Sequence, residues 1–310
     1  MSTFLVTGGA GFIGSHIVGS LIEKGQKVRI LDNFSSGKMA NLANVEEDID
    51  IVKADIRSID ACIKATKGAD FVLHQAALRS VPKSMKNPGE YNEVNISGTL
   101  NMLEASKRNK VKSFVLASSS SVYGDAGKFP EKEDFPPQPI SPYALTKLTG
   151  EHYCQIFSQY YGLSTVSLRY FNVFGPRQAL DDEYAVVIPK FISCMLKDQS
   201  PPIYGNGKQS RDFTYVGNVV DANILATKKR FKGEVFNVAS GRDYTILELV
   251  AILNRLLGKR IKPVFLPLRL GDVFKTHASL SASKKTLGFN PGINFIEGLK
   301  QTVEYFKENA

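Results

Sequence analysis

The sequence predicts an α/β fold, in which a doubly wound parallel sheet is joined to a smaller C-terminal α/β lobe. Three observations support this fold class. Short β-branched runs alternate with amphipathic stretches over the first 173 residues, a glycine-rich loop follows the first run, and turn-forming residues crowd together after residue 173. Strands that alternate with helices form βαβ units, whose parallel sheet is covered by helices on both faces.

The expected strands are short, apolar and rich in β-branched residues, and they lie at residues 4–8, 28–32, 49–55, 70–76, 112–118, 164–172 and 234–240. Helical periodicity is found at residues 12–25, 92–109, 142–161, 185–197, 245–257 and 295–308. Open α/β sheets bind their ligands at the carboxyl ends of the strands. We therefore expect the chemistry of this protein at residues that directly follow a strand.

The C-terminal part of the chain has a different pattern, with proline and glycine concentrated at residues 174–178, 200–210 and 263–272. This pattern predicts a smaller lobe packed over the carboxyl ends of the strands. We expect the sheet domain to comprise residues 1–173 and 214–240, and the lobe to comprise residues 174–213 and 241–310.

Composition excludes several classes of protein. The three cysteines, Cys62, Cys154 and Cys194, are far apart, which argues against a disulfide framework or a metal site and fits a reducing cytoplasm. The N-terminus has no basic region of the signal-peptide type, and no apolar run approaches the ~20 residues of a membrane span. The net charge of +9 comes from scattered residues, so we expect a solvated surface rather than a nucleic-acid interface.

The glycine loop GGAGFIG (8–14) lies between the first strand and the first helix and contains Gly8, Gly11 and Gly14. Glycines here allow a tight turn and bring backbone N–H groups close to a pyrophosphate, which the positive end of the helix dipole also attracts. The spacing alone is weak evidence, but its position between a strand and a helix predicts a dinucleotide site.

Two further strand ends carry acidic residues. Asp32 ends the second strand, where a carboxylate accepts hydrogen bonds from the adenosine ribose and repels a 2′-phosphate, so that NAD is favoured over NADP. Lys38 is the nearest cation that could weaken this preference. Asp55 and Ile56 follow the third strand and could flank an adenine, although a turn aspartate and a core isoleucine explain them equally well.

Tyr143 and Lys147 are four residues apart in SPYALTK (141–147), on one face of a predicted helix that Ser-Pro begins. A lysine charge beside a phenol favours the phenolate and lowers the pKa of the tyrosine, which makes Tyr143 a candidate general acid and base. The spacing also arises by chance among 12 tyrosines, and Tyr204 and Lys208 repeat it. That second pair lies in a turn-rich loop, so we prefer the first.

With these features in place, the chain resembles the extended branch of the short-chain dehydrogenase/reductase superfamily, and within it the nucleotide-sugar 4-epimerases that act on UDP-glucose or UDP-N-acetylglucosamine. The resemblance covers essentially the whole chain. It rests on TGGAGFIGSH (7–16), LDNFSSGK (31–38), ADIR (54–57), HQAALRSV (74–81), VNISGTLNMLEA (94–105), SSSSVYGD (118–125), SPYALTK (141–147), LRYFNVFGPRQ (168–178), VVIPKF (186–191), IYGNGKQSRDFTYV (203–216) and RLGDV (269–273).

The resemblance implies a Rossmann-type fold with NAD as the cofactor. The implied cofactor contacts are Gly8, Gly11, Phe12, Ile13, Gly14, Asp32, Asn33, Ser36, Gly37, Asp55, Ile56, Gln75, Ala76, Ala77, Arg79, Asn95, Tyr143, Lys147 and Phe171. Among them, Asn95 would lie near the nicotinamide, and Arg79 stands where UDP-galactose 4-epimerases often have a lysine.

The resemblance also implies the substrate site. Its catalytic residues would be Ser119, Tyr143 and Lys147, and its substrate contacts Ser119, Ser120, Ser121, Tyr143, Asn172, Val187, Ile203, Tyr204, Arg211, Arg269, Asp272 and Thr276. The two arginines would clamp the diphosphate, because guanidinium groups match phosphate oxygens. Thr276 stands at a position that in the family limits the size of the sugar 2-substituent, and a threonine would admit both a hydroxyl and an N-acetyl group.

In the implied reaction, Tyr143 removes the proton of the sugar 4-hydroxyl while C4 is oxidised, and the 4-keto sugar turns over before it is reduced on its other face. Related 4,6-dehydratases have an Asp-Glu pair where this chain has Ser120 and Ser121, and UDP-glucuronate decarboxylases have a glutamate at the second position. Dehydration is therefore disfavoured and decarboxylation doubtful, whereas UDP-glucuronate 4-epimerisation stays open. A non-catalytic relative that senses NAD or binds RNA is a further alternative.

The resemblance finally implies a cytoplasmic enzyme of polysaccharide biosynthesis that forms a homodimer. Helices at about 91–108 and 142–161 of each chain would form a four-helix bundle. The second of these has an apolar and aromatic stripe, which core packing explains equally well: Leu148, Tyr153, Ile156, Phe157 and Tyr160.

Overall fold

A seven-stranded parallel sheet forms the centre of the protein in a computed structural model, which describes residues 1–179, 187–268 and 273–309. The strand order is β11-β6-β5-β4-β1-β2-β3, so the chain starts in the middle of the sheet and winds outward in both directions. All six strand pairs are parallel. The predicted fold class is confirmed, and each predicted strand is present.

The sheet strands are β1 (Thr3–Thr7), β2 (Lys27–Asp32), β3 (Ile49–Lys53), β4 (Phe71–His74), β5 (Ser113–Ser119), β6 (Thr165–Tyr170) and β11 (Lys232–Val238). The helices beside them are α1 (Phe12–Glu23), α2 (Ile59–Thr66), α3 (Val81–Lys86), α4 (Pro88–Tyr91), α5 (Gly98–Arg108), α6 (Pro142–Tyr161) and α8 (Val216–Ala226). The lobe contains α7 (Val187–Leu196), α9 (Ile246–Leu257), α10 (Phe295–Glu308), β8 (Pro202–Tyr204), β9 (Ser210–Asp212), β12 (Asp243–Thr245) and β13 (Val264–Leu266), and β7 (Val173–Phe174) pairs with β10 (Thr214–Tyr215).

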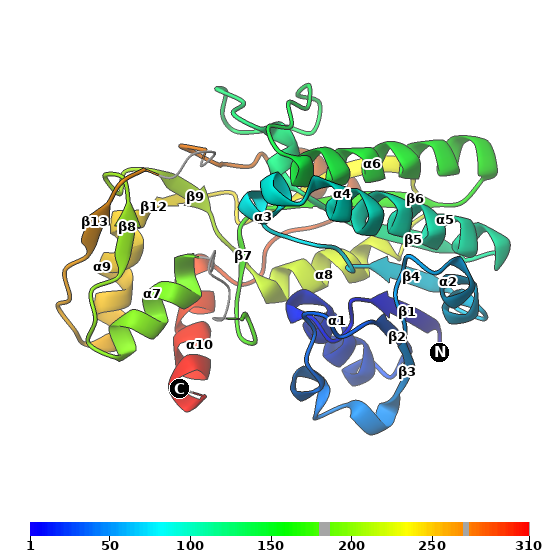
Figure 1. Ribbon diagram of the computed structural model, residues 1–310, viewed down its shortest axis with the longest axis horizontal. Coiled ribbons are helices and arrows are strands. Elements are labelled where there is room, and N and C mark those ends of the chain that lie inside the picture. The colour runs from blue at the N-terminus through cyan, green and yellow to red at the C-terminus, as the bar shows by residue number, and fades with distance from the viewer. Residues whose placement is uncertain (180–186, 269–272, 310) are drawn as a thin grey trace.

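Alternation along the strands separates the apolar core into two layers. Phe4 and Val6 of β1 face the layer formed with α1 and α8, whereas Leu5 between them faces α2, α5 and α6. Figure 1 shows α5 and α6 side by side over one face of the sheet and α1 on the other. None of the helices in the described ranges is long and apolar enough to cross a bilayer.

A third apolar cluster lies in the lobe, where α7, α9 and α10 pack together at the left of Figure 1. Residues 278–289 follow strands of the lobe in sequence but pack on the sheet domain. Their apolar side chains that join the sheet cluster are Ala278, Leu280, Leu287 and Phe289. The expected domain boundaries stay a prediction.

The helix expected at residues 92–109 is not a continuous α-helix. Helix α4 runs into a π-helical turn at Asn92–Ser97 before α5 begins at Gly98. A π-helical turn has one residue more than an α-helical turn. Asn95 lies in this turn, and its buried side chain forms hydrogen bonds with the backbone of Leu78. Gly98 allows a close approach here, because a Cβ would lie 2.6 Å from the Ile56 side chain, which would have to shift.

Candidate functional site

The glycine loop forms a close-packed turn at the start of α1. Gly8 has a positive φ of 65°, and Gly11 N donates to Gly8 O at 3.1 Å. A Cβ on Gly14 would lie 2.1 Å from Gly8 O, so this position accepts only glycine. The first N–H groups of α1 therefore face an open cleft, in the arrangement that suits a pyrophosphate.

Asp32 stands at the edge of the same loop. Its carboxylate accepts hydrogen bonds from Ala10 N at 2.9 Å and Phe34 N at 2.8 Å. Gly37 packs behind it, where a Cβ would lie 3.0 Å from the carboxylate. Two backbone donors hold the carboxylate toward the cleft, which fits a group that receives ribose hydroxyls.

Asp55 is tied to its neighbours more tightly than the sequence suggested. Arg57 forms a two-point ion pair with it, at 3.0 Å and 2.9 Å, and Asn33 donates at 2.8 Å. The Arg57 hydrogen bond is the main reason why the pKa of Asp55 falls to about 2, so the carboxylate stays charged at the rim of the cleft.

These groups line a single cleft of about 940 Å³ along the carboxyl edge of the sheet. It brings together most of the predicted cofactor residues: Gly8, Gly11, Phe12, Ile13, Gly14, Asp32, Asn33, Ser36, Asp55, Ile56, Gln75, Ala76, Ala77, Arg79, Tyr143 and Lys147. It also contains the predicted substrate residues Ser119, Ser120, Ser121, Tyr143, Asn172, Arg211 and Thr276. Its volume lies in the upper part of the range of about 300–1,000 Å³ that is usual for ligand pockets.

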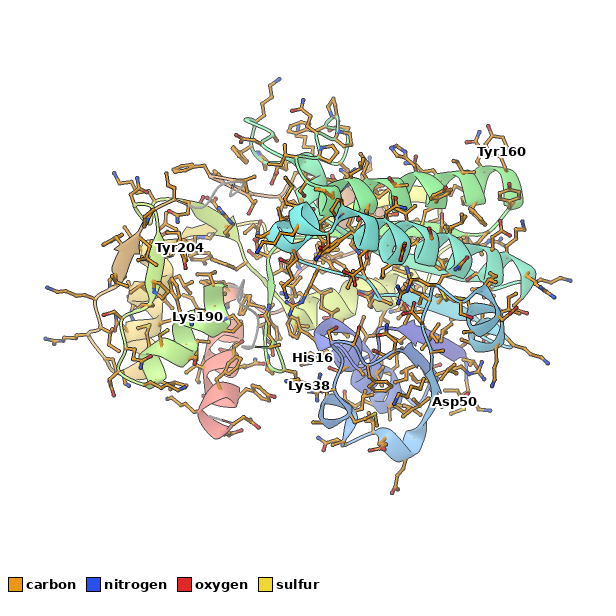
Figure 2. The ribbon with its side chains drawn as sticks, in the orientation of Figure 1. His16, Lys38, Asp50, Tyr160, Lys190 and Tyr204 are labelled. Carbon is orange, nitrogen blue, oxygen red and sulfur yellow. The ribbon has the colours of Figure 1, made fainter. Side chains whose placement is uncertain are left out.

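Six predicted residues do not line the cleft: Gly37, Asn95, Phe171, Val187, Ile203 and Tyr204. The side chain of Phe171 is fully buried in the sheet core, and that of Ile203 is buried in the lobe cluster. Figure 2 shows Tyr204 on β8 within the lobe. Arg269 and Asp272 lie outside the described residues.

Asn95 is a predicted cofactor contact whose side chain is bonded within the protein. It is buried, accepts from Leu78 N at 2.8 Å, and donates to Leu78 O at 3.0 Å and to Thr146 at 3.1 Å. All of its bonding capacity on the amide nitrogen is used inside the protein. Asn95 therefore holds the backbone that leads to Arg79.

The serines that end β5 have separate environments. Ser118 is buried and donates to Glu151 at 2.5 Å, and Glu151 forms a two-point ion pair with Arg169 behind the site. Ser119 Oγ accepts from Ser121 N at 3.2 Å and from Ser121 Oγ at 2.9 Å. Because its acceptor positions are occupied, the Ser119 proton can be donated outward, and Ser119 is near enough to Tyr143 to lower the pKa of its phenol.

Tyr143 lies in the first turn of α6, which begins at Pro142 and is capped by Ser141, whose hydroxyl accepts from Ala144 N at 3.2 Å. One turn later, Lys147 Nζ donates to Ala117 O at 2.9 Å and lies 5.9 Å from the Tyr143 ring centre. The helix thus places both groups beside the end of β5, as the spacing predicted.

The electrostatic prediction for Tyr143 was incomplete. Burial raises the pKa of Tyr143, and the Ser119 hydrogen bond and the Arg79 charge oppose this effect only in part. Burial also lowers the pKa of Lys147 to about 8. Desolvation therefore shifts the pKa of Tyr143 upward, opposite to the direction that the sequence predicted from the Lys147 charge.

Arg177 is a cleft residue that the sequence analysis missed. Its backbone has a positive φ of 65°, and the preceding carbonyl of Pro176 lies 2.9 Å from His16 Nε2 on α1. Burial, with a contribution from the Arg177 charge, lowers the pKa of His16 to about 4, so the neutral ring donates to Pro176 O. Figure 2 labels His16 between α1 and the lobe. The FGPRQ segment was the available signal, since its turn follows a sheet strand.

The C-terminal helix α10 also contributes to the cleft, through Tyr305, Phe306 and Asn309. No sequence pattern pointed to them, because they come close only when the lobe packs on the sheet.

A glycine loop at the sheet edge, the Asp32 carboxylate and a Ser-Tyr-Lys set in one cleft indicate an enzyme of the dinucleotide-binding α/β class. The family model described as the NAD dependent epimerase/dehydratase family matches residues 4–239. The chain belongs to this family.

Similar proteins extend over the full chain. The structure of the UDP-N-acetylglucosamine 4-epimerase from Methanobrevibacter ruminantium M1, in complex with UDP-N-acetylmuramic acid, is 45% identical with a TM-score of 0.96 and covers 100% of this chain and 99% of its own. The Thermus thermophilus UDP-glucose 4-epimerase in complex with NAD is 36% identical, with a TM-score of 0.90 and coverage of 99% and 100%. A putative UDP-glucose 4-epimerase of Methanocaldococcus jannaschii is 41% identical over 98% of both chains. The protein is accordingly an isomerase that uses NAD.

Proposed function

We propose that the protein epimerises UDP-hexoses at C4, interconverting UDP-N-acetylglucosamine with UDP-N-acetylgalactosamine and UDP-glucose with UDP-galactose. The observation that carries this proposal is the cleft itself, in which Ser119, Tyr143 and Lys147 meet and Ser120 and Ser121 stand beside them. Epimerisation needs one acid/base group and no additional carboxylate at those two positions.

Each residue has a role that its contacts support. Tyr143 takes the proton of the 4-hydroxyl and later returns it, with Ser119 as the relay between sugar and phenol. Lys147, held by Ala117 O, orients the nicotinamide ribose and supplies positive charge. Bound NAD supplies the reversible hydride acceptor. The loop glycines hold its pyrophosphate and Asp32 its adenosine ribose.

Substrate scope is the finer part of the proposal. Thr276 lines the cleft, and its hydroxyl accepts from Asn172 Nδ2 at 2.9 Å and Asp212 N at 3.2 Å. Threonine is a small side chain and these two bonds fix its hydroxyl, which supports room for either a 2-hydroxyl or a 2-N-acetyl group. Arg79 keeps UDP-glucuronate as a second candidate substrate, since a cation in the cleft suits a sugar carboxylate.

We also propose a homodimer through α5 and α6. Only part of the predicted apolar stripe on α6 is free to form an interface. Phe157 is buried, and Leu148 and Tyr153 pack against the core. Ile156 and Tyr160 are 44% and 71% exposed. Figure 2 shows Tyr160 at the far end of α6. Further exposed apolar residues on this helix are Leu145 and Tyr161. All three cysteines are free and buried, which supports the proposed cytoplasmic setting.

The test is incubation of the enzyme with UDP-glucose, UDP-N-acetylglucosamine and UDP-glucuronate in separate reactions, with NMR assignment of the product at C4. We expect axial and equatorial 4-hydroxyl epimers at equilibrium for the first two sugars. A decarboxylated pentose product from the third would instead show the decarboxylase alternative. No turnover of any of the three, together with salt-sensitive RNA binding, would favour a non-catalytic relative.

A further inference from the structure

Segment 274–278 carries the cleft residue Thr276 and is attached along one edge of β9. Ser210 N donates to Phe274 O at 3.0 Å, and Thr276 N donates to Ser210 O at 3.2 Å. On its other edge, β9 pairs with β12 in antiparallel register, Asp243 opposite Asp212. The strand that carries Arg211 therefore lies between β12 and the Thr276 segment.

Asp243 of β12 binds both residues that flank Thr276. Its Oδ2 lies 3.0 Å from Lys275 Nζ, and its Oδ1 lies 2.9 Å from His277 Nδ1. Burial raises the pKa of Asp243, but hydrogen bonds from Ser210 and Lys275 and the charges of Lys275 and His277 outweigh it, so the pKa falls below its usual range. One carboxylate thus holds the segment at two points, on either side of Thr276.

The same segment orients two proposed substrate contacts. Arg211 Nη1 donates to Phe274 O at 3.1 Å, and Asn172 Nδ2 donates to Thr276 Oγ1 at 2.9 Å. Arg211 and Thr276 both line the cleft. A displacement of the segment would therefore move the guanidinium and the threonine hydroxyl together.

The loop at 129–131 supports the segment from outside. Glu131 N donates to His277 O at 2.7 Å, and His277 N donates to the Glu131 carboxylate at 3.1 Å. Lys275 Nζ also lies 5.4 Å from the Phe129 ring centre. Lys275 and His277 are each held on two sides, which leaves Thr276 with little freedom.

We propose that Asp243 is a positioning residue for UDP-sugar binding, acting through its ion pair with Lys275 and its contact with the His277 ring on the segment that presents Thr276 and orients Arg211. This inference rests on the proposed function, which places these two residues against the substrate. The residues proposed for proton transfer belong to β5 and α6, and within the described ranges no hydrogen bond joins them to this segment. Asp243 should therefore affect binding and leave the chemical step unchanged.

The test compares wild-type enzyme with Asp243→Asn, Lys275→Met and the double variant, all loaded with NAD. Calorimetry gives the Kd for UDP, and steady-state kinetics give KM and kcat for the UDP-sugar that the enzyme turns over. We expect Asp243→Asn to raise Kd and KM by about three- to tenfold, as the loss of a partly buried ion pair does, with kcat within about twofold of wild type. Lys275→Met should weaken UDP binding less than Asp243→Asn does. The Kd of the double variant should rise by less than the product of the two single-variant increases, because the two residues act through the same contact.

Asp221→Asn is the matched control, because Asp221 is an exposed carboxylate on α8 outside the cleft. It should leave Kd, KM and NAD content at wild-type values. An unchanged Kd in Asp243→Asn would overturn the inference, as would a parallel loss of NAD and kcat, which would indicate general damage. Failure of the proposed function is a different result, namely no turnover of UDP-hexoses by wild type, and the UDP-binding comparison then still decides the role of Asp243.

Discussion

At the scale of single residues, Tyr143 is flanked by two cations of different character. Lys147 is buried, and its pKa of about 8 means that part of its population is neutral at mildly alkaline pH. Arg79 also lies in the cleft, and an arginine keeps its charge at any pH where the protein is folded. Of the two, the Arg79 charge lowers the pKa of the Tyr143 phenol.

Tyr143→Phe tests the acid/base assignment. Removing the hydroxyl should lower kcat by about 10²- to 10⁴-fold, the usual contribution of a general acid or base. NAD content should stay at the wild-type value, because the ring and Lys147 remain. The measurement is single-sugar turnover followed by NMR, and Tyr161→Phe, at an exposed position of the same helix, is the control. A Tyr143→Phe enzyme with near-normal kcat would show that another group moves the proton.

Arg79→Gln tests whether the Arg79 charge lowers the pKa of Tyr143. The Arg79 charge lowers the pKa of Tyr143, so its removal should raise that pKa. The base form of Tyr143 would then appear at higher pH, and the acidic limb of the kcat profile should move upward by about half a unit to one unit. Arg79→Lys keeps the charge and should leave the limb in place. Equal profiles for Arg79→Gln and wild type would remove Arg79 from this role.

At the scale of elements, the turn from β1 into α1 depends on close backbone contacts between glycines, which leave no space for a side chain. The loop after β4 is held in a different way, by side chains that bond to its backbone. Tyr91 OH donates to Arg79 O and Ser80 O, and Asn95 accepts from Leu78 N. Tyr91 also packs edge-on against Tyr143, with ring centres 6.5 Å apart. The π turn is thus part of the support of the site.

Gly14→Ala should abolish cofactor retention. The new Cβ would meet Gly8 O at 2.1 Å, so the loop must move away from the geometry that faces the cleft. We expect purified enzyme with little NAD, measured by absorbance after denaturation, and a lower unfolding temperature. Gly19→Ala on the same helix is the matched control, because its Cβ meets nothing within 4 Å. That variant should keep NAD and gain up to about 1 kcal/mol of stability. A Gly14→Ala protein with full NAD content would contradict the assigned geometry.

At the scale of the whole molecule, the cleft exists because the lobe closes over the sheet edge. Residues of β5, the loop after β6, β9 and α10 contribute to one cavity although they are distant in sequence. The proposed dimer lies on the other side of α6, so assembly and catalysis use opposite faces of one helix.

Ile156→Lys tests the dimer. A charge at this exposed apolar position on α6 should shift the protein to monomer in sedimentation experiments, because a buried unpaired charge is costly at an interface. Gln199→Lys, at an exposed position beyond α7, adds the same charge elsewhere and should leave the association state unchanged. A monomeric wild type, or an Ile156→Lys protein that associates normally, would exclude this interface.

The sequence alone determined the parallel sheet, its strand positions, the glycine loop and the placement of Tyr143 and Lys147 on one helical face, because each depends on local periodicity, on short-range sterics or on a four-residue helical spacing. Ser119 was implied only by the resemblance to a known family, and its catalytic role stays a prediction. Only the tertiary structure decided which residues face the cleft. Asn95, Phe171 and Ile203 are turned into the protein, whereas Arg177, Tyr305 and the Asp243 contacts are brought to the site by contacts between distant segments. The state of Tyr143 was decided at the same level, since desolvation depends on everything packed around a group and cannot be read from its neighbours in the chain.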